Sequence, residues 1–369
     1  NLLIFMTNKS LFSPFSINNH ELKNRFVMAP MTRNFSPEGI PSEYAPEYYA
    51  KRARGGVALI LTEGVEVSHP SSSGYPDVPN LTSSESKKMW TQVVEEVHKH
   101  DSKIFCQLWH VGGIRKPGID KNKDVPGYTP SGLVRANKKV AYEMTLDDIQ
   151  EMISIYAEDA KICEELGFDG VEIHGAHGYL IDQFFWSDTN VRSDKYGGSL
   201  EKRTQFARDI IQACQNVTNE DFSVGIRFSQ WKQQDYDAKL ALNENELKIF
   251  VDCLSESKPD FFHTSMRRFW EPEMNNSSLA ALVKGMTDIP VIGVGSVGLD
   301  KDFIRLYAGD DKTKISDFDQ LFDSFQAEEF DLIAIGRALL SDPDWVKKLE
   351  QNKMDTIVPF DKSFVENYV

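Results

Sequence analysis

Residues 145–180, TLDDIQEMISIYAEDAKICEELGFDGVEIHGAHGYL, join a helical pattern to a buried strand and a polar turn. Apolar residues recur at the spacing of a helix with one buried face: Ile149, Met152, Ile153, Tyr156, Ala160, Cys163 and Leu166. Thr145 is placed to cap the start of this helix, and Gly167 is placed to end it in a left-handed conformation. The apolar run Val171–Ile173 then predicts a buried strand, and the turn HGAHGYL (174–180) follows it directly.

The same alternation of strand and helix recurs along the whole chain. Short apolar runs that end in polar or glycine-rich turns predict eight strands: Arg25–Met28, Val57–Thr62, Lys103–Leu108, Val171–Ile173, Ser223–Phe228, Phe261–Thr264, Pro290–Val294 and Asp331–Ile335. Two of these runs contain ALIL (58–61) and LIAI (332–335), which are apolar without interruption, as expected of strands covered on both faces. Helical patterns separate the runs, so the sequence predicts an α/β fold, a (β/α)8 TIM barrel of parallel strands.

Two segments depart from this repeat. Residues 11–24 precede the first predicted strand and have the pattern of a short β-hairpin around Asn18 and Asn19, placed to close the bottom of the barrel. Residues 110–143 are rich in glycine and proline without periodicity, which is typical of a lid or a binding loop. No linker or repeat divides the chain, so residues 1–369 are expected to form a single domain. Residues 1–10 are expected to be flexible or foreign to the natural chain, with Met6 as a candidate start.

The composition limits the partners of the chain. A net charge of −15 argues against nucleic acid, because phosphate binding needs clustered lysine and arginine. No apolar stretch approaches the roughly 20 residues of a membrane helix, so no membrane partner is expected. The four cysteines lie far apart without metal-ligand spacing, which is typical of reduced, buried thiols in a cytoplasmic protein. Whether the chain forms a homodimer is left open.

Residues that can do chemistry gather where the predicted strands end, which is the active face of a TIM barrel. These strand ends are MAPMTR (28–33), TEG (62–64), QLWH (107–110), HGAHGYL, Arg227, RRFW (267–270), GVGSVG (293–298) and GR (336–337). GVGSVG also has the pattern of the dinucleotide fingerprint, but that fingerprint follows the first strand of a βαβ unit and needs an acidic residue after the next strand. Here it follows the seventh predicted strand, so a phosphate site built from Gly295, Ser296, Gly336 and Arg337 is the better interpretation. The alternative is that these glycines only turn the chain.

Together these motifs resemble the Old Yellow Enzyme family of FMN-dependent NAD(P)H oxidoreductases and ene-reductases. The resemblance rests on LKNRFVMAPMTR (22–33), QLWH, Arg227, GVGS, IGR and above all HGAHGYLIDQFFWSDTNVRSDKYGGSLEKR (174–203). These segments follow one another in the family's order over nearly the whole chain. The resemblance implies noncovalent FMN, with NADH or NADPH as the reductant.

The resemblance also implies which residues contact the flavin. They are Ala29, Pro30, Met31, Thr32, Gly64, Gln107, His174, Arg227, Gly295, Ser296, Gly336 and Arg337. Thr32 is implied near O4 of the flavin, and Arg227 near N1 and O2. A fixed guanidinium suits the negative charge of a reduced flavin in a dry site. The alternative for Arg227 is a structural salt bridge with a barrel carboxylate.

The turn HGAHGYL places His174 and His177 three residues apart on a loop broken by glycine. Two N–H groups from such a pair can converge on one substrate oxygen and polarise a carbonyl or nitro group. Tyr179 then stands beside the substrate as a proton donor, since a phenol stays protonated at neutral pH. The alternatives are a metal site, for which H-x-x-H supplies only two ligands, histidines without a role, and a tyrosine that only packs.

Aromatic residues at the strand ends are candidates for the substrate pocket. Trp109, Phe269 and Trp270 are assigned to it, with ordinary packing as the alternative. Arg267 and Arg268 either steer the nucleotide reductant or are solvated. The segments RFSQW (227–231) and RRFWEP (267–272) differ from the commonest members of the family, so the resemblance says least about the substrate.

The sequence therefore predicts an oxidoreductase that passes hydride from NAD(P)H through FMN to a small molecule: an activated alkene such as an enone, a quinone or a nitro compound. Two other functions stay open. One is a flavin-free, phosphate-binding barrel with lyase or isomerase activity, which would need a lysine or paired carboxylates at the strand ends. The other is a protein that binds flavin without turnover.

Overall fold

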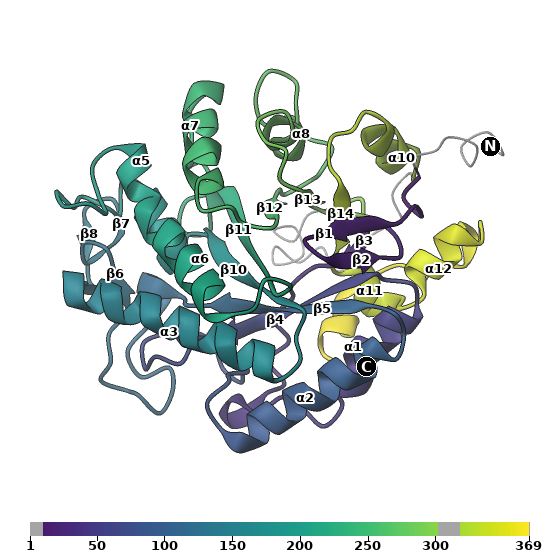
Figure 1. The fold of residues 1–369 in the computed structure, drawn as a ribbon, viewed down its shortest axis with the longest axis horizontal. Coiled ribbons are helices and arrows are strands. Elements are labelled where there is room, and N and C mark those ends of the chain that lie inside the picture. Colours follow the sequence, from purple (N-terminus) through teal and green to yellow (C-terminus); the bar gives the residue numbers. More distant parts are fainter. Residues whose placement is uncertain (1–9, 302–317, 369) are drawn as a thin grey trace.

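The computed structural model describes residues 10–301 and 318–368, and in this part of the chain eight strands close into a barrel (Figure 1). The strands are β3 (Phe26–Met28), β4 (Leu59–Glu66), β5 (Lys103–Trp109), β10 (Gly170–His177), β11 (Ser223–Lys232), β12 (Phe262–Ser265), β13 (Val291–Val294) and β14 (Leu332–Ile335). Each pairs in parallel with its neighbours, and β14 closes the barrel against β3. Every one of these strands overlaps a predicted run, so the predicted TIM barrel is confirmed.

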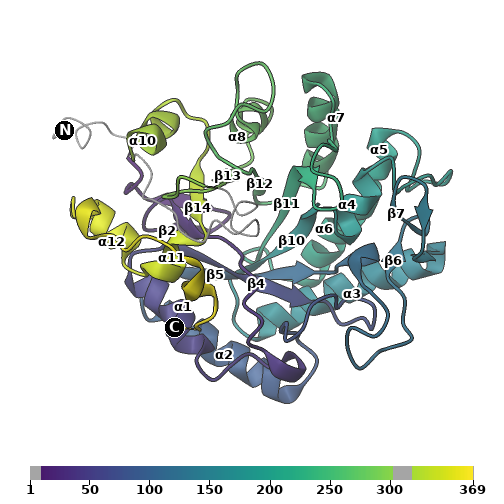
Figure 2. The ribbon, with the colours of Figure 1, turned by 180° about the vertical axis from the view of Figure 1, so that it is seen from behind.

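Helices cover the outside of the barrel, as the two opposite views show (Figures 1 and 2). The longer ones are α1 (Ala45–Arg54), α2 (Ser84–His98), α3 (Leu146–Glu165), α6 (Gln205–Val217), α7 (Glu244–Ser255) and α10 (Phe318–Gln326). The shorter ones are α4 (Leu180–Phe185), α5 (Leu200–Arg203), α8 (Leu279–Lys284), α11 (Ala338–Ser341) and α12 (Trp345–Glu350). Single 3-10 turns stand at Pro37–Gly39, Gly112–Ile114, Met354–Thr356 and Lys362–Val365.

Helix α3 begins and ends as the sequence predicts. The Thr145 hydroxyl accepts a hydrogen bond from the backbone N–H of Asp148, and the Asp148 carboxylate accepts one from the backbone N–H of Thr145. This capping box satisfies N–H groups that have no partner within the helix. Gly167 follows the last turn with φ of +92°, which glycine adopts without steric cost.

The N-terminal hairpin closes the bottom of the barrel. Strands β1 (Phe15–Ile17) and β2 (His20–Leu22) pair antiparallel, and Asn18 turns between them with φ of +50°. Ile17 and Leu22 are buried in one apolar cluster with barrel residues that include Leu59, Phe105, Phe261 and Leu332. The Asn18 amide also donates to the carbonyl of Glu220, which precedes β11. The hairpin therefore plugs the amino ends of the strands, as predicted, and leaves the carboxyl ends free for a site.

The long segment after β5 is more ordered than its sequence pattern indicates. It contains the short strands β6 (Tyr128–Thr129), β7 (Leu133–Arg135), β8 (Lys138–Lys139) and β9 (Tyr142–Glu143), which lie beside α3 and α5 (Figures 1 and 2). Arg115, buried within it, makes two hydrogen bonds to Asp120. Arg192 donates to the carbonyls of Pro130 and Met144. These interactions tie the segment to the loop after β10.

Three expectations from composition concern the rest of the fold. In residues 10–301 and 318–368, no helix is long and apolar enough to cross a membrane. The four cysteines are buried and unpaired. The expectation about residues 1–10 falls, apart from Ser10, outside the described residues.

Candidate functional site

A cavity of about 680 Å³ opens at the carboxyl ends of the barrel strands. The residues predicted for the site that line it are Ala29, Pro30, Met31, Thr32, Trp109, His177, Tyr179, Arg227, Gly295, Ser296, Gly336 and Arg337. They come from six different strand ends and run from Ala29 to Arg337 along the sequence. The barrel thus brings together most of the residues to which the sequence gives a role.

Five predicted site residues do not line this cavity. Gly64 lies behind Trp109, and a Cβ atom at Gly64 would lie 2.4 Å from Cε3 of the indole, so glycine makes room for the ring. The Gln107 amide donates to Glu172 at 2.8 Å, and Glu172 also contacts His263 at 2.6 Å, in a buried chain of polar groups. Phe269 and Trp270 pack on each other with ring centroids 5.1 Å apart. For these two aromatics, the packing alternative is what the structure contains. The fifth residue is His174.

His174 is buried next to the cavity among other rings. Its imidazole stacks on Trp109 at 6.0 Å and meets the rings of His177 and Tyr179 edge to face, at 5.1 Å and 5.0 Å. The backbone N–H of Ala176 donates to Nδ1 of His174 at 3.3 Å, and burial lowers the pKa of the ring well below its ordinary value. The ring is therefore neutral, with its proton on Nε2, the nitrogen that can donate to a ligand.

His177 lies at the edge of the cavity in a backbone conformation that side chains rarely adopt. Its φ is +65°, and Gly178 after it has φ of +78°. The imidazole stacks on Trp231 at 4.4 Å, and its Nε2 lies 2.7 Å from Oγ of Ser265. Burial lowers the pKa of His177 well below its ordinary value, and the charge of Arg227 acts in the same direction. Both histidines are thus neutral hydrogen-bonding groups.

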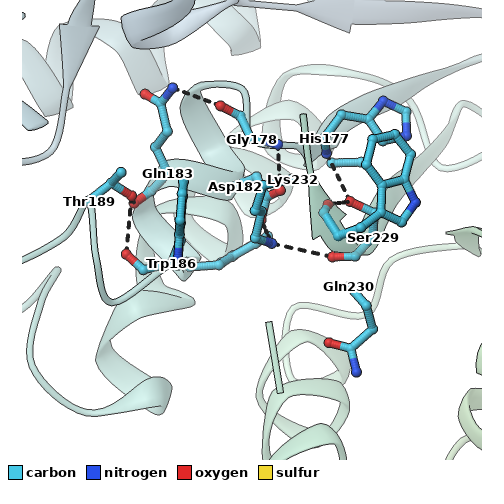
Figure 3. Close-up of polar contacts among 12 residues, drawn as sticks. His177, Gly178, Asp182, Gln183, Trp186, Thr189, Ser229, Gln230 and Lys232 are labelled. Carbon is cyan, nitrogen blue, oxygen red and sulfur yellow. Dashed lines mark hydrogen bonds and ion pairs between the residues drawn. The ribbon is translucent and has the colours of Figure 1, made fainter. Parts of the chain in front are cut away.

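A buried polar network holds the turn at His177 and Gly178 (Figure 3). The backbone N–H of His177 donates to the Ser229 hydroxyl at 2.9 Å, and that of Gly178 donates to the Asp182 carboxylate at 2.7 Å. The carbonyl of Gly178 accepts from Gln183 at 2.7 Å. Asp182 in turn pairs with Lys232 at 2.5 Å, and both side chains are fully buried. Because each polar group of the turn has a partner, the strained conformation of His177 is fixed.

The buried ion pair between Asp182 and Lys232 should affect the stability of the fold because each charge compensates the other. Burial raises the pKa of Asp182 and lowers that of Lys232, while their mutual attraction opposes both shifts. In Lys232→Met the carboxylate loses its cation, and we expect a loss of about 3–5 kcal/mol in the free energy of unfolding. The double variant Asp182→Asn with Lys232→Met should regain most of this loss, because no charge then needs to be desolvated and the amide oxygen can still accept from the backbone N–H of Gly178. Urea denaturation measures both.

The exposed pair of Lys248 and Asp252 provides the matched control for this experiment. Lys248→Met should change the free energy of unfolding by no more than about 0.5 kcal/mol, because exposed ion pairs contribute little. Equal losses in the single and double variants at Lys232 would contradict the prediction, since they would show that packing rather than charge is responsible.

Tyr179 lines the cavity from the position just before α4. Its ring meets Trp109 edge to face at 5.0 Å, and its hydroxyl lies 3.1 Å from that of Tyr75. The Tyr75 hydroxyl also donates to the Gln233 amide oxygen at 3.4 Å. Tyr179 is 8% exposed, so its hydroxyl can reach both the cavity and a neighbouring phenol.

Arg227 projects from β11 into the cavity, where it is almost fully buried. Its Nη2 donates to Oγ of Ser265 at 3.0 Å, and its Nε is buried without a partner. Burial lowers the pKa of Arg227, and the charge of Glu172 opposes this. In the part of the chain that the structure describes, a hydroxyl rather than a carboxylate is its hydrogen-bonding partner. The alternative of a structural salt bridge is therefore not what this geometry offers.

The ends of β13 and β14 form the other side of the cavity. Val294 pairs with Ala334, so Gly295 and Gly336 follow at the ends of neighbouring strands. Gly295 is packed closely, since a Cβ atom there would lie 2.8 Å from the carbonyl oxygen of Met266. Ser296 has φ of +51°, and its hydroxyl donates to the carbonyl of Arg267. Arg337 lines the cavity and donates to the carbonyl of Lys301 at 2.8 Å.

Several lining residues were not singled out in the sequence. Tyr75, Gln233, Tyr236 and Ser265 belong to irregular segments or to a strand end without a motif. Trp231 continues β11 beyond Arg227, and the alternation of a strand would place it on the same face as Arg227 and Ser229. This alternation is the one signal from which its position could have been predicted.

The last residues of the described chain also reach the cavity. Val365 lines it, and Arg33 holds this segment by donating to the carbonyls of Phe364, Val365 and Asn367. The ring of Tyr368 stacks on Tyr48 of α1 at 4.4 Å, and the C-terminal end lies beside α1 in both views (Figures 1 and 2). The C-terminal segment therefore forms part of one wall of the cavity.

The histidine pair gains no additional metal ligand from its surroundings. Within residues 10–301 and 318–368, no group of three or more His, Cys, Asp or Glu residues is arranged to hold a metal ion. The neighbours of His174 and His177 include aromatic rings, the hydroxyl of Ser265, His263 and the cations Arg227 and Lys232. The positive charge of Arg227 next to the two histidines disfavours the binding of a metal cation there.

Comparisons with known proteins identify the relatives of this chain. Residues 10–356 match the model of the NADH:flavin oxidoreductase / NADH oxidase family. Flavin oxidoreductase hxnT of Emericella nidulans is 34% identical over 360 residues, which cover 92% of this chain and 90% of that protein. NADH oxidase of Thermoanaerobacter brockii is 32% identical over 361 residues, which cover 94% of this chain but 52% of that protein. The chain therefore spans about half the length of this second relative.

The fold has a close counterpart among solved structures. An asparagine-to-alanine variant of morphinone reductase in complex with tetrahydroNAD superposes with a TM-score of 0.77, covering 97% of this chain and 94% of that one. The sequence identity is 24%, so this likeness bears on the fold.

Proposed function

Because the chain belongs to the NADH:flavin oxidoreductase / NADH oxidase family, also called the Old Yellow Enzyme family, we propose that it reduces enones, quinones or nitro compounds with hydride from NAD(P)H, carried by noncovalent FMN. The observation that carries the proposal is one cavity lined by a buried arginine, a neutral histidine and a tyrosine, with a second neutral histidine, His174, packed against them. These groups supply what the reaction needs beside a hydride carrier. Arg227 is a cation, Tyr179 is an acid, and the two histidines are N–H donors that together bind the substrate oxygen, a pair called the clamp below.

The residues of the cavity fit a flavin mononucleotide. Arg227 has a buried Nε without a partner, and it lies among groups that leave room for a planar, polar ring edge. Gly295, Ser296, Gly336 and Arg337 stand together at the ends of β13 and β14, where backbone N–H groups and a guanidinium suit a phosphate. Ala29, Pro30, Met31 and Thr32 offer a continuous stretch of wall that follows β3, the neighbour of β14. When bound, FMN supplies the site that accepts hydride from NAD(P)H and passes it on.

The chain itself contributes positioning, charge and a proton. His174 and His177, both neutral, donate hydrogen bonds to the substrate oxygen and draw electron density toward it. The β-carbon of an enone, which is conjugated to this oxygen, then becomes the better hydride acceptor. Tyr179, whose ring packs against Trp109, gives a proton to the α-carbon. Arg227 stabilises negative charge on its side of the cavity.

Cofactor release tests this proposal directly. Purified protein should be yellow, and heat denaturation should release FMN, identified by chromatography against FMN and FAD standards. Arg337→Ala should weaken FMN retention by roughly ten- to a hundredfold, because it removes a charge-assisted interaction worth about 1.5–3 kcal/mol. Equilibrium dialysis measures the change. Release of FAD, or no flavin binding after reconstitution, would remove the basis of the proposal.

The two other functions predict different results in the same experiment. A flavin-free lyase or isomerase would give colourless protein that gains nothing from added FMN. A protein that only binds flavin would be yellow but would not consume NADH or NADPH in the presence of enones, quinones or nitro compounds.

A further inference from the structure

Ser265, the last residue of β12, connects two groups that the proposed function treats separately. Its Oγ lies 3.0 Å from Nη2 of Arg227 and 2.7 Å from Nε2 of His177. The side chain is buried at the wall of the cavity, and its own carbonyl accepts a hydrogen bond from Nε1 of Trp231 at 3.2 Å, which fixes the strand end. The ring of Trp231 stacks in turn on His177 at 4.4 Å. Ser265 itself carries no sequence motif.

Hydrogen-bonding capacity determines the direction of each of these bonds. A guanidinium only donates, so Oγ of Ser265 must accept from Arg227. The hydroxyl keeps one hydrogen, and in the part of the chain that the structure describes its acceptor is Nε2 of His177. If Nε2 of His177 instead carried a proton, Ser265 would accept twice and its own hydrogen would be left unpaired in a buried place, which costs about 1–3 kcal/mol.

The protonation of His177 follows from this direction. The ring is neutral, because burial and the charge of Arg227 both lower its pKa. With Nε2 accepting, the one ring proton lies on Nδ1. His174 has the opposite arrangement, since its Nδ1 accepts from the backbone N–H of Ala176 and its proton lies on Nε2.

We propose that Ser265 is a positioning residue that fixes His177 as its Nδ1–H tautomer, so that the two clamp histidines donate through different ring nitrogens, Nε2 of His174 and Nδ1 of His177. Arg227, which is assigned to the flavin side of the cavity, orients the Ser265 hydroxyl. That hydroxyl in turn orients the imidazole of His177. The consequence for ligand binding rests on the proposed function. The tautomer itself does not, because it follows from contacts within the chain.

Three variants separate this role from general packing. Ser265→Ala removes the hydroxyl, and Ser265→Thr keeps it. Ser223→Ala is the matched control, because Ser223 lies on the neighbouring strand β11 with a buried hydroxyl that has no hydrogen-bonding partner. Loss of the Ser223 hydroxyl should leave every measurement below unchanged.

The tautomer is measured by two-bond 1H–15N correlation spectra of the purified protein labelled with 15N-histidine. The His177 signals are assigned by their absence in His177→Asn. In the native protein we expect Nδ1 protonated and Nε2 unprotonated, retained in Ser265→Thr and converted to a mixture in Ser265→Ala. A proton on Nε2 of His177 in the native spectrum would overturn the proposal, and this spectrum needs no variant to fold. An unchanged tautomer in a folded Ser265→Ala would overturn it as well.

Binding of 4-hydroxybenzaldehyde to the FMN-loaded protein gives the functional result. Ser265→Ala should weaken binding about tenfold, the effect of one lost hydrogen bond, while Ser265→Thr should stay within about twofold of the native value. Equal weakening in Ser265→Ala and Ser265→Thr would show a packing effect and overturn the positioning role. Absence of phenol binding in the native protein would instead count against the proposed function, and the spectra would still decide the tautomer.

Discussion

Tyr179→Phe should lower the turnover of enones by about 10²–10⁴, the range of a positioned general acid, while leaving the reduction of the flavin by NAD(P)H near its native rate. The reason lies in the two half-reactions. Taking hydride from NAD(P)H needs no acid from the protein, whereas alkene reduction needs a hydride on one carbon and a proton on the next. The substitution keeps the ring, so its edge-to-face contacts with Trp109 and His174 persist. Rapid mixing of each half-reaction separately measures the effect.

Quinones and a second tyrosine provide the controls for Tyr179→Phe. Quinone reduction should be nearly unaffected, because the reduced oxygens can take protons from water. Tyr156→Phe removes a buried hydroxyl on α3, outside the cavity lining and without a hydrogen-bonding partner in residues 10–301 and 318–368, and it should change neither half-reaction. If enone and quinone reduction slow equally in Tyr179→Phe, the hydroxyl is not the proton donor, and Tyr179 has a packing or positioning role.

The fold followed from patterns that are local in sequence. Strands buried on both faces must be apolar without interruption, and helices on the outside must carry one apolar face, so each element could be recognised by itself. The same holds for the cap at Thr145, the stop at Gly167 and the turn at Asn18. The long segment after β5 was the exception, because its order depends on contacts between residues far apart in sequence, such as those of Arg115 with Ser73 and of Arg192 with Pro130.

The site could be predicted only where a motif lies at the end of a strand. His177, Tyr179, Arg227 and Arg337 line one cavity because parallel strands bring their carboxyl ends together. Ser265 escaped notice because a serine after an apolar run has no distinguishing pattern. Its contacts depend on the register of β12 against β11, in which Arg227 is paired with His263.

Phe269 and Trp270 show that a position at a strand end does not by itself place a side chain in the cavity. They stand at a strand end like the true lining residues, but the chain turns after β12, and the backbone N–H of Phe269 donates to the carbonyl of Gly295 at 3.0 Å. The rings of Phe269 and Trp270 pack on each other, and neither lines the cavity. A turn of this kind depends on tertiary contacts, which the order of residues does not express. Tyr236 and Trp231 form that wall instead, with their rings stacked 5.7 Å apart.

The double variant His174→Ala with His177→Ala should abolish tight binding of phenols, whose anions resemble a polarised substrate oxygen, while FMN stays bound. Each donor in a dry site is worth roughly 3 kcal/mol, so the two together should weaken affinity by at least 10³. FMN should be retained because Arg227 and the ends of β13 and β14 are unchanged. Titration with 4-hydroxybenzaldehyde, followed by the change in the flavin absorbance spectrum, measures the affinity, and the flavin content of the purified variant is measured alongside.

Single variants measure how much each histidine contributes to phenol affinity. His174→Ala and His177→Ala should each weaken phenol binding by about 10² or more, and the double variant should lose less than the sum if one donor alone no longer orients the ligand. Native phenol affinity in the double variant would refute the clamp. Stoichiometric zinc in the native protein, lost from the double variant, would instead support the metal alternative. The strained backbone at His177, with φ of +65°, allows a further test. Asparagine tolerates this backbone conformation, and its side-chain amide can still donate a hydrogen bond. His177→Asn should therefore retain more phenol affinity than His177→Ala.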